Sequence, residues 1–332
     1  MRIARIAARF AGLAAIATLG AAALAPSAAL AQAAAFPTKP IHLSVPFPPG
    51  GVSDAAARLV AEAMGKRLGQ QVVVENRPGA TGNVAGAHIA QSEPDGYSMM
   101  LAFNGILTIN PFVFDKMPFD AQKDFTPIGR IGDYPFIITV NPNVEAKNLA
   151  ELIALSKSNP KGLDYGTSGN GSNEHLIATL IVEKSGAKLV HVPYKGGGPA
   201  MADAMAGHIQ IGMASVAGGT ALVKSGKLRA IAVSSAERWP SMPDVPTIVE
   251  TVPDVVVMSW IGLIGPAKMP RAIVERLNAE LNASLSTQEL RDKLFALGVR
   301  VTPGTPEAFR DEIKKDYDRF GPVIKSAGIK VE

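Results

Sequence analysis

A strand, a loop of proline and glycine, and a helix follow one another near the start of this chain, and this run constrains the fold most. Residues 41–45 are apolar and alternate, which predicts a buried strand. Apolar residues recur at helical spacing over 54–68, which predicts an amphipathic helix. Ser53 or Asp54 is placed to cap it, behind Pro48-Pro49-Gly50-Gly51. The N–H groups at a helix start suit an anion, although an ordinary tight turn explains this loop equally well.

The N-terminal segment predicts export. Three arginines precede an apolar run and the small residues Ala29-Leu30-Ala31, which indicates that residues 1–31 are a secretory signal peptide, with cleavage near Ala35 as the alternative. Removing three arginines and no acidic residue lowers the formal net charge from +4 to +1. A mature protein so close to neutral gives no reason to expect nucleic acid or a membrane surface as a partner. The chain has no cysteine, so packing must replace disulfides.

Strands and helices alternate through the rest of the chain, in the rhythm of a parallel sheet covered on both faces. A second strand, glycine loop and helix follow at 163–184, and a third glycine loop stands at 194–198. Two such runs predict an α/β fold with two lobes facing one cleft. The expected division is 37–136 with 260–332 in lobe 1 and 137–259 in lobe 2, with crossings near 136–140 and 258–262.

Two further strands are expected where the apolar pattern is short. One covers 136–140 and begins only after a region interrupted by prolines, and the other covers 209–213. No helix is expected between 213 and the strand at 228–233. The C-terminal tail is predicted to be helical over 270–285, 287–297 and 306–326.

The sequence offers little support for an enzyme. It has no G-x-x-x-x-G-K-[ST] loop, and Gly169-x-Gly171 lacks the third glycine of a dinucleotide fingerprint. The five histidines have no metal-ligand spacing. His175 stands near Ser168 and Ser172, but no G-x-S-x-G elbow accompanies them. We therefore expect no catalysis, no cofactor and no metal.

Taken in order along the mature chain, several segments resemble the Bug-type extracytoplasmic solute receptors of tripartite tricarboxylate transporters. The segments are Val45-Pro46-Phe47, Gly50-Gly51 with Asp54, the run VENRPGATGN at 74–83, Asp95-Gly96-Tyr97, the run YGTSGNGS at 165–172 with His175-Leu176, the run HVPYKG at 191–196, the run GKLRA at 226–230 and the run PDVPT at 243–247. Together they cover nearly the whole mature chain.

This resemblance implies a type II periplasmic-binding-protein fold with two Rossmann-like lobes. The cleft between them is expected to hold a small organic carboxylate, such as a di- or tricarboxylate or an aromatic acid. Implied partners are the membrane permease subunits, and the implied location is the periplasm. We expect a monomer; a receptor that presents a carboxylate to a sensor kinase is the alternative. The implied ligand-binding residues are Phe47, Gly50, Gly51, Ser53, Asp54, Asn104, Ser168, Gly169, Asn170, Gly171, Ser172, His175, Tyr194, Lys195, Gly196 and Ser215.

Three expectations about the site follow. Many relatives have Asp-Asn where this chain has Ala214-Ser215, which makes an amino-acid ligand less expected. The backbone amides of the glycine loops should carry more of the affinity than Lys195, and a Cβ on Gly51 should obstruct the solute, with a left-handed backbone there as a second obstacle. Asp54 should organise the helix start without touching the carboxylate, so Asp54→Asn should keep much of the affinity.

Overall fold

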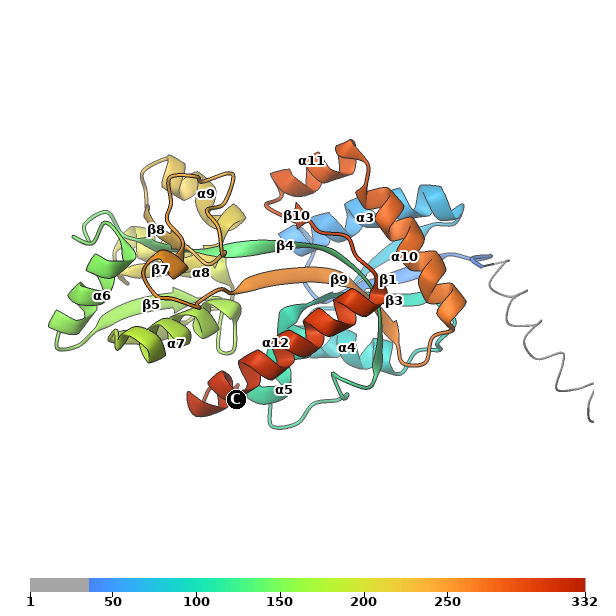
Figure 1. The fold of residues 1–332 in the computed structure, drawn as a ribbon, viewed down its shortest axis with the longest axis horizontal. Helices are drawn as coiled ribbons and strands as arrows, with labels where there is room; N and C mark the ends of the chain where they lie inside the picture. The colour runs from blue at the N-terminus through green and yellow to red at the C-terminus, as the bar shows by residue number, and fades with distance from the viewer. Residues whose placement is uncertain (1–35, 332) are drawn as a thin grey trace, which may run out of the picture.

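The computed structural model describes residues 36–331 and has two α/β lobes that lie side by side (Figure 1). The predicted signal peptide lies outside the described residues. Lobe 1 carries the N-terminal strands and most of the C-terminal helices, whereas lobe 2 carries the middle of the chain. Over residues 36–331, none of the helices combines the length and the apolar character that crossing a bilayer requires.

Lobe 1 begins with the strand–loop–helix that the sequence predicts. Helix α3 starts at Val52, and its N-cap is Gly51, which makes no side-chain capping bond. The expectation that Ser53 or Asp54 caps the helix is therefore wrong, since both lie inside the first turn. The elements of this lobe are β1 (Ile41–Val45), α3 (Val52–Leu68), β2 (Val72–Asn76), η1 (Ala80–Gly82), α4 (Asn83–Ala90), β3 (Ser98–Phe103), η2 (Gly105–Ile109), α5 (Asn110–Val113), β9 (Met258–Pro266), α10 (Arg271–Leu285), α11 (Gln288–Ala296), β10 (Arg300–Val301) and α12 (Pro306–Ser326).

Lobe 2 repeats the pattern with β5 and α7. A helix that the sequence did not predict, α9, follows β7 directly, because the Ser215 side chain caps it by accepting a hydrogen bond from the Gly218 N–H. Strand β7 also lies two residues later than expected. The elements of this lobe are α6 (Leu149–Ser158), β5 (Leu163–Thr167), α7 (Asn173–Ser185), β6 (Leu189–Pro193), α8 (Gly197–Ala206), β7 (Ile211–Ser215), α9 (Val216–Lys224), β8 (Arg229–Val233) and η3 (Ile248–Glu250).

One long strand, β4 (Phe125–Val140), belongs to both lobes. Its first part pairs antiparallel with β9 and β10, and its last five residues pair antiparallel with β7 and β8. The sequence pattern predicted a strand only over 136–140, because Pro127 and Pro135 interrupt the apolar run before it. The strand tolerates its prolines with register shifts against β9 between Pro127 and Gly129 and between Arg130 and Gly132.

The second crossing runs beside the first and is tied to it by Ser234. The Ser234 Oγ accepts a hydrogen bond from the Phe136 N–H at 2.9 Å and donates to the Val257 carbonyl at 2.6 Å. The Ser234 and Val257 backbone N–H groups add bonds to the Phe136 and Ser234 carbonyls. Ser234 is fully buried, so these bonds join the two crossings away from water. Figure 1 shows β4 and β9 running together between the lobes.

Each lobe has its own apolar core, and helix α12 reaches both. Phe309 and Ile313, in the first half of α12, pack in the core of lobe 1. Phe320 and Ile324, near its end, pack in the core of lobe 2. The residue boundaries given above for the two lobes remain a prediction.

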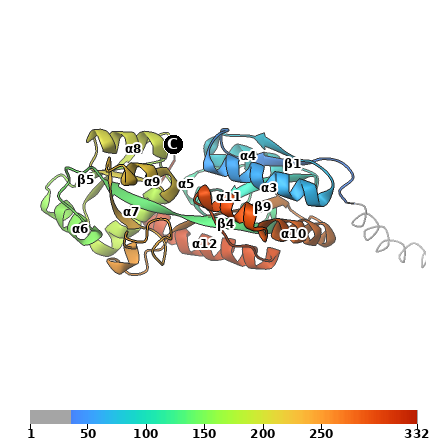
Figure 2. The same cartoon turned by 90° about the horizontal axis from the view of Figure 1, so that it is seen from above.

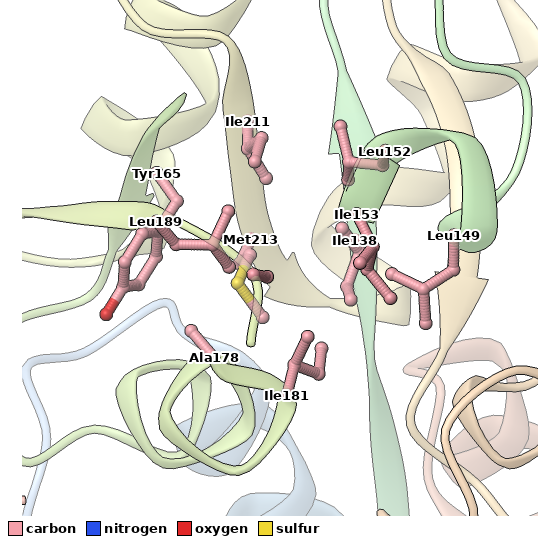
Figure 3. A pocket seen from close by; sticks show the side chains of 11 residues that line it. Ile138, Leu149, Leu152, Ile153, Tyr165, Ala178, Ile181, Leu189, Ile211 and Met213 are labelled. Carbon is pink, nitrogen blue, oxygen red and sulfur yellow. The ribbon is translucent and has the colours of Figure 1, made fainter. Parts of the chain in front are cut away.

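A small apolar cavity lies inside lobe 2, between its sheet and helices α6 and α7 (Figure 3). Its volume is about 10 Å³, which is close to the minimum for one water molecule. Its lining, which includes Ile138, Leu152, Ile181, Ile211 and Met213, is apolar and offers a water no partner. We interpret it as a packing gap in the core and not as a ligand site.

We predict that Asp133→Ala strongly destabilises the protein. Asp133 is 3% exposed and accepts hydrogen bonds from Arg130 Nη2 at 2.6 Å and from Arg300 Nε at 2.9 Å. Removing the carboxylate takes hydrogen bonds from Arg130, which keeps Glu312 at 2.9 Å, and from the half-exposed Arg300, so the loss should be about 1–3 kcal/mol. Urea unfolding measures this loss. Asp115→Ala, which breaks an exposed pair with Lys330, is the control and should leave the unfolding midpoint unchanged. Equal midpoints for both variants would contradict the prediction.

Candidate functional site

A cleft of about 1070 Å³ separates the two lobes and collects residues from both glycine loops. From lobe 1 it is lined by Phe47, Gly51, Val52, Thr81, Phe103 and Gly105, and from the crossing strand by Tyr134 and Phe136. From lobe 2 it is lined by 168–174, 193–198, Ala214, Ser215 and neighbouring helix residues. Val331 also lines it, and Figure 2 shows strand β4 running from one lobe to the other.

Asp54 stabilises the first glycine loop through hydrogen bonds within lobe 1. One of its oxygens accepts from the Gly50 N–H at 3.0 Å and from Arg58 Nε at 3.2 Å, and the other accepts from Asn76 Nδ2 at 2.8 Å. Asp54 is 4% exposed and lies outside the cleft lining. The hydrogen bond from Arg58 is the main reason that the pKa of Asp54 falls to about 2, against the opposing effect of burial. The carboxylate is therefore ionised and fully engaged by its own lobe.

The two glycines of this loop differ in their backbone. Gly50 has φ +92°, a left-handed conformation that favours glycine. Gly51 has φ −81° and ψ 170°, which any residue adopts, and a Cβ built on it meets nothing within 4 Å. The backbone obstacle considered for a Gly51 substitution is therefore absent. Because Gly51 lines the cleft, its missing side chain leaves open space there.

The second loop, 168–172, also uses its own groups to hold its shape. Gly169 and Gly171 have φ +135° and +70°. The Gly169 N–H donates to Thr167 Oγ1 at 3.2 Å, and the Gly171 N–H donates to His175 Nδ1 at 3.3 Å. Ser172 caps α7 by accepting from the His175 N–H at 3.2 Å. Three of the four glycine N–H groups that were expected to bind the solute are thus engaged inside the protein.

Two stacked histidines lie next to this loop, and one of them accepts a hydrogen bond from it. The His175 and His191 rings stack with centroids 3.8 Å apart, and Tyr165 stacks on the other side of His191 at 5.0 Å. Burial lowers the pKa of His175 and of His191 to about 4. Both rings are therefore neutral near neutral pH, which suits His175 Nδ1 as the acceptor of the Gly171 N–H.

A buried amide pair forms the floor of the cleft. Asn104 Nδ2 donates to Asn173 Oδ1 at 2.7 Å, and Asn173 Nδ2 donates back to Asn104 Oδ1 at 3.2 Å. Asn104 is also bonded to the Met258 carbonyl at 3.1 Å and to the Ser259 hydroxyl at 3.1 Å. The end of β3 in lobe 1, the start of α7 in lobe 2 and the second crossing therefore meet in one hydrogen-bonded group.

The third glycine loop supplies the cation of the cleft. Lys195 is exposed and, within residues 36–331, has no acidic partner within 4.0 Å. The neighbouring Tyr194 donates its hydroxyl to Asp203 at 2.6 Å, and burial together with this bond raises the pKa of Tyr194 to about 12. Lys195 is thus a solvated charge at the rim, while Tyr194 is fixed and neutral.

The structure brings most of the predicted site residues to the cleft. Those in its lining are Phe47, Gly51, Ser168, Gly169, Asn170, Gly171, Ser172, Tyr194, Lys195, Gly196 and Ser215. Those behind the lining are Gly50, Ser53, Asp54, Asn104 and His175, whose described contacts hold the loops and the floor. Contact of any of these residues with a ligand remains a prediction.

Thr81 and Glu174 are among the cleft residues that sequence reasoning missed. Thr81 lies in a run of four left-handed residues, with φ from +45° to +133° at Gly79–Gly82, and Asn110 Nδ2 holds its carbonyl at 3.0 Å. Backbone held in such sparsely populated conformations clusters at binding sites, but only the glycines were visible as a signal. Glu174, in the first turn of α7, is 5% exposed, and Ser168 Oγ donates to its Oε2 at 3.0 Å.

The chemistry of the cleft is that of a binding site with many donors. Serines, first-turn residues of two helices and Lys195 line it, and the N–H groups of a first turn have no partner inside their helix. Across residues 36–331, no group of three or more His, Cys, Asp and Glu is arranged to hold a metal ion. The arrangement suits an anion with several oxygens.

Comparison with known proteins agrees with this geometry. Residues 56–329 match the model of the tripartite tricarboxylate transporter family receptor. The chain is 32% identical to BugT of Bordetella pertussis over 299 residues, which are 90% of this chain and 92% of BugT. R. palustris Rpa4515 with adipate superposes with a TM-score of 0.80 at 33% identity, covering 89% of this chain and 99% of that one. MatC from Rhodopseudomonas palustris with bound malate gives 0.76 at 29% identity, covering 87% and 100%.

We predict that Asp54→Asn destabilises the protein, whereas the expectation that it keeps much of the affinity stays a prediction. Every neighbour of the carboxylate is a donor, so an amide NH₂ would face Arg58, Asn76 or the Gly50 N–H and leave buried donors unpaired. The loss should be about 1–3 kcal/mol in the free energy of unfolding. Glu62→Gln, an exposed acid on the same helix, is the control and should change little.

The pH dependence of this loss has a definite sign. The pKa of Asp54 is about 2 in the folded protein and 3.8 ordinarily, so its contribution is present above about pH 4 and is lost as the pH falls towards 2. The difference in stability between wild type and Asp54→Asn should therefore shrink over that interval, as followed by urea unfolding. A difference that stays constant down to pH 2 would contradict the assignment.

Proposed function

This chain belongs to the receptor family of tripartite tricarboxylate transporters, and from that premise we propose that it captures a small organic carboxylate and delivers it to membrane permease subunits. The observation that carries the proposal is the cleft between the lobes, about 1070 Å³ in volume and rich in hydroxyl and N–H donors. Adipate and malate in two relatives support a dicarboxylate, a tricarboxylate or an aromatic acid as the ligand class.

The donors proposed to meet the ligand differ from those expected from the sequence. Since three glycine N–H groups are already engaged, the first-turn N–H groups of Val52 and Asn173 take their place. The hydroxyl of Ser215 adds a donor from lobe 2, and Lys195 adds a charge at the rim. Each hydrogen bond to a charged oxygen is worth about 1.5–3 kcal/mol, so a few of them suffice for tight binding.

We further propose that the protein works in the periplasm as a monomer and performs no chemistry on its ligand. Receptors in the same family support this role. The cleft offers neither the nucleophile elbow nor the paired acid and base that hydrolysis would need.

Native mass spectrometry of freshly purified mature protein tests the function directly. We expect a retained small acid that is released unchanged on unfolding, and calorimetry with that acid should give saturable binding. Recovery of a chemically altered acid after incubation would indicate an enzyme. Absence of binding for the straight-chain diacids, for malate and for tricarboxylates would refute the proposal.

We predict that Gly51→Val abolishes ligand binding and leaves the fold intact. The backbone at Gly51 accepts any residue, and the new side chain would project into the open cleft. Thermal unfolding should stay cooperative at an unchanged midpoint, while calorimetry should detect no binding. Gly304→Val, outside the cleft and with only Ala308 Cβ near the added atom at 3.9 Å, is the matched control and should bind normally.

Lys195→Ala provides the comparison for the charge. Its loss should weaken binding by about 1 kcal/mol at most and should change the salt dependence only mildly, because the ammonium is exposed. If Lys195→Ala lost all binding while Gly51→Val kept it, the cleft would be a cation-dependent site and the donor set proposed here would be wrong.

We propose that the lobes, divided near 136/137 and 259/260, close on the ligand by bending at the two crossings. The register shifts in β4 and the proline at 135 support a bend there, while Ser234 keeps the crossings together. Small-angle scattering of the mature protein should give a smaller radius of gyration at saturation with ligand. An unchanged radius at full occupancy would count against closure.

A further inference from the structure

Glu174 is a buried acid in the wall of the cleft that has no cation beside it. It is 5% exposed, lines the cleft, and within the described chain has no Lys, Arg or His nitrogen within 4.0 Å. Burial raises the pKa of Glu174, and hydrogen bonds from its own N–H, from Ser168 and from Ser172 oppose that effect. Asp54, at the corresponding place in lobe 1, is instead paired with Arg58.

The charged and titratable groups around Glu174 do not compensate a second negative charge. Tyr134 of β4 faces it, and burial raises the pKa of Tyr134, so this phenol stays neutral. His175, next on the helix, stacks away on His191 with a pKa of about 4. Lys195 lies at the solvent-exposed rim of the same cleft. A ligand carboxylate that enters beside Glu174 therefore meets an acid with no resident counter-charge.

We propose that Glu174 takes up a proton when the ligand binds and shares it with one ligand carboxylate, which makes it a specificity-determining residue for acids. The inference rests on the proposed function, because it takes the ligand to be a carboxylate. A ligand ammonium is the other chemistry that a buried acid could meet. The positive end of the α7 dipole, the hydroxyl donors and Lys195 all disfavour a cation at this place.

The proton has a defined path in this arrangement. In the free protein, the Ser168 hydroxyl donates its single proton in a hydrogen bond to Glu174 Oε2, with an O···O distance of 3.0 Å. Once Glu174 takes a proton from solvent, its O–H donates either to the ligand carboxylate or to Ser168 Oγ. In the second case the Ser168 proton turns to the ligand instead. Each route places about one extra proton in the complex and no net negative charge on Glu174.

Calorimetry over the whole pH range in which the protein stays folded tests the inference, with malate and the straight-chain diacids from malonate to sebacate as probes. On the alkaline side of the Glu174 titration, wild-type affinity should fall about tenfold per pH unit. Glu174→Gln, which keeps a donor in place, should bind within about threefold of wild type at the lowest pH and show no such fall. Glu183→Gln, an exposed acid at the other end of α7, should behave as wild type.

The outcomes separate this inference from the proposed function. A wild-type affinity that is flat with pH, or loss of all binding in a folded Glu174→Gln, would overturn the role of the shared proton. Tighter binding of 6-aminohexanoate than of adipate would instead mark Glu174 as an ionised partner of an ammonium. If no diacid bound to the wild type, the proposed carboxylate function would itself fail and this inference with it.

Discussion

Both walls of the cleft depend on strand β4, because its two parts belong to the sheets of different lobes. Each part is fixed in register by its own sheet, so one continuous backbone sets how the loops after β1 and β5 face each other. Ser234 holds the second crossing to the same path, and the Asn104–Asn173 pair ties the floor to both lobes. These bonds are buried, and breaking any of them leaves polar groups without water.

The glycine loops are shaped by side chains that lie behind them. Asp54 accepts a hydrogen bond from the Gly50 N–H, and His175 accepts one from the Gly171 N–H. These bonds stabilise the left-handed conformations of the two glycines. This use of the glycine amides leaves other donors, mainly hydroxyls and first-turn N–H groups, for a ligand. The glycines contribute chiefly by their conformation and by the space they leave. Gly51 illustrates this, since a Cβ added there would have no atom within 4 Å.

Local sequence patterns predicted most helices and strands of this fold. The features that they did not predict depend on contacts between segments that are distant in the sequence. Strand β1 and helix α12 have the expected ends, since apolar periodicity and turn residues fix them locally. The early start of β4 was missed because its prolines are tolerated only through register shifts against a strand more than a hundred residues later. Glu174 was missed for a similar reason. Its burial depends on how the two lobes meet, whereas in the sequence it is one acid at a helix start.

The two acids at the helix starts explain why the walls of the cleft differ in character. Asp54 is balanced by Arg58 and Asn76, so its wall has the same charge and shape whether or not a ligand is present. Glu174 has only hydroxyl and N–H donors, so its charge is free to change when another anion approaches. Such a cleft can position a ligand acid against the fixed donors of lobe 1. On the lobe 2 side, protonation of Glu174 can compensate the negative charge of the ligand. Under the proposed function, the chain would hold an anion between its lobes without burying an arginine in the cleft lining.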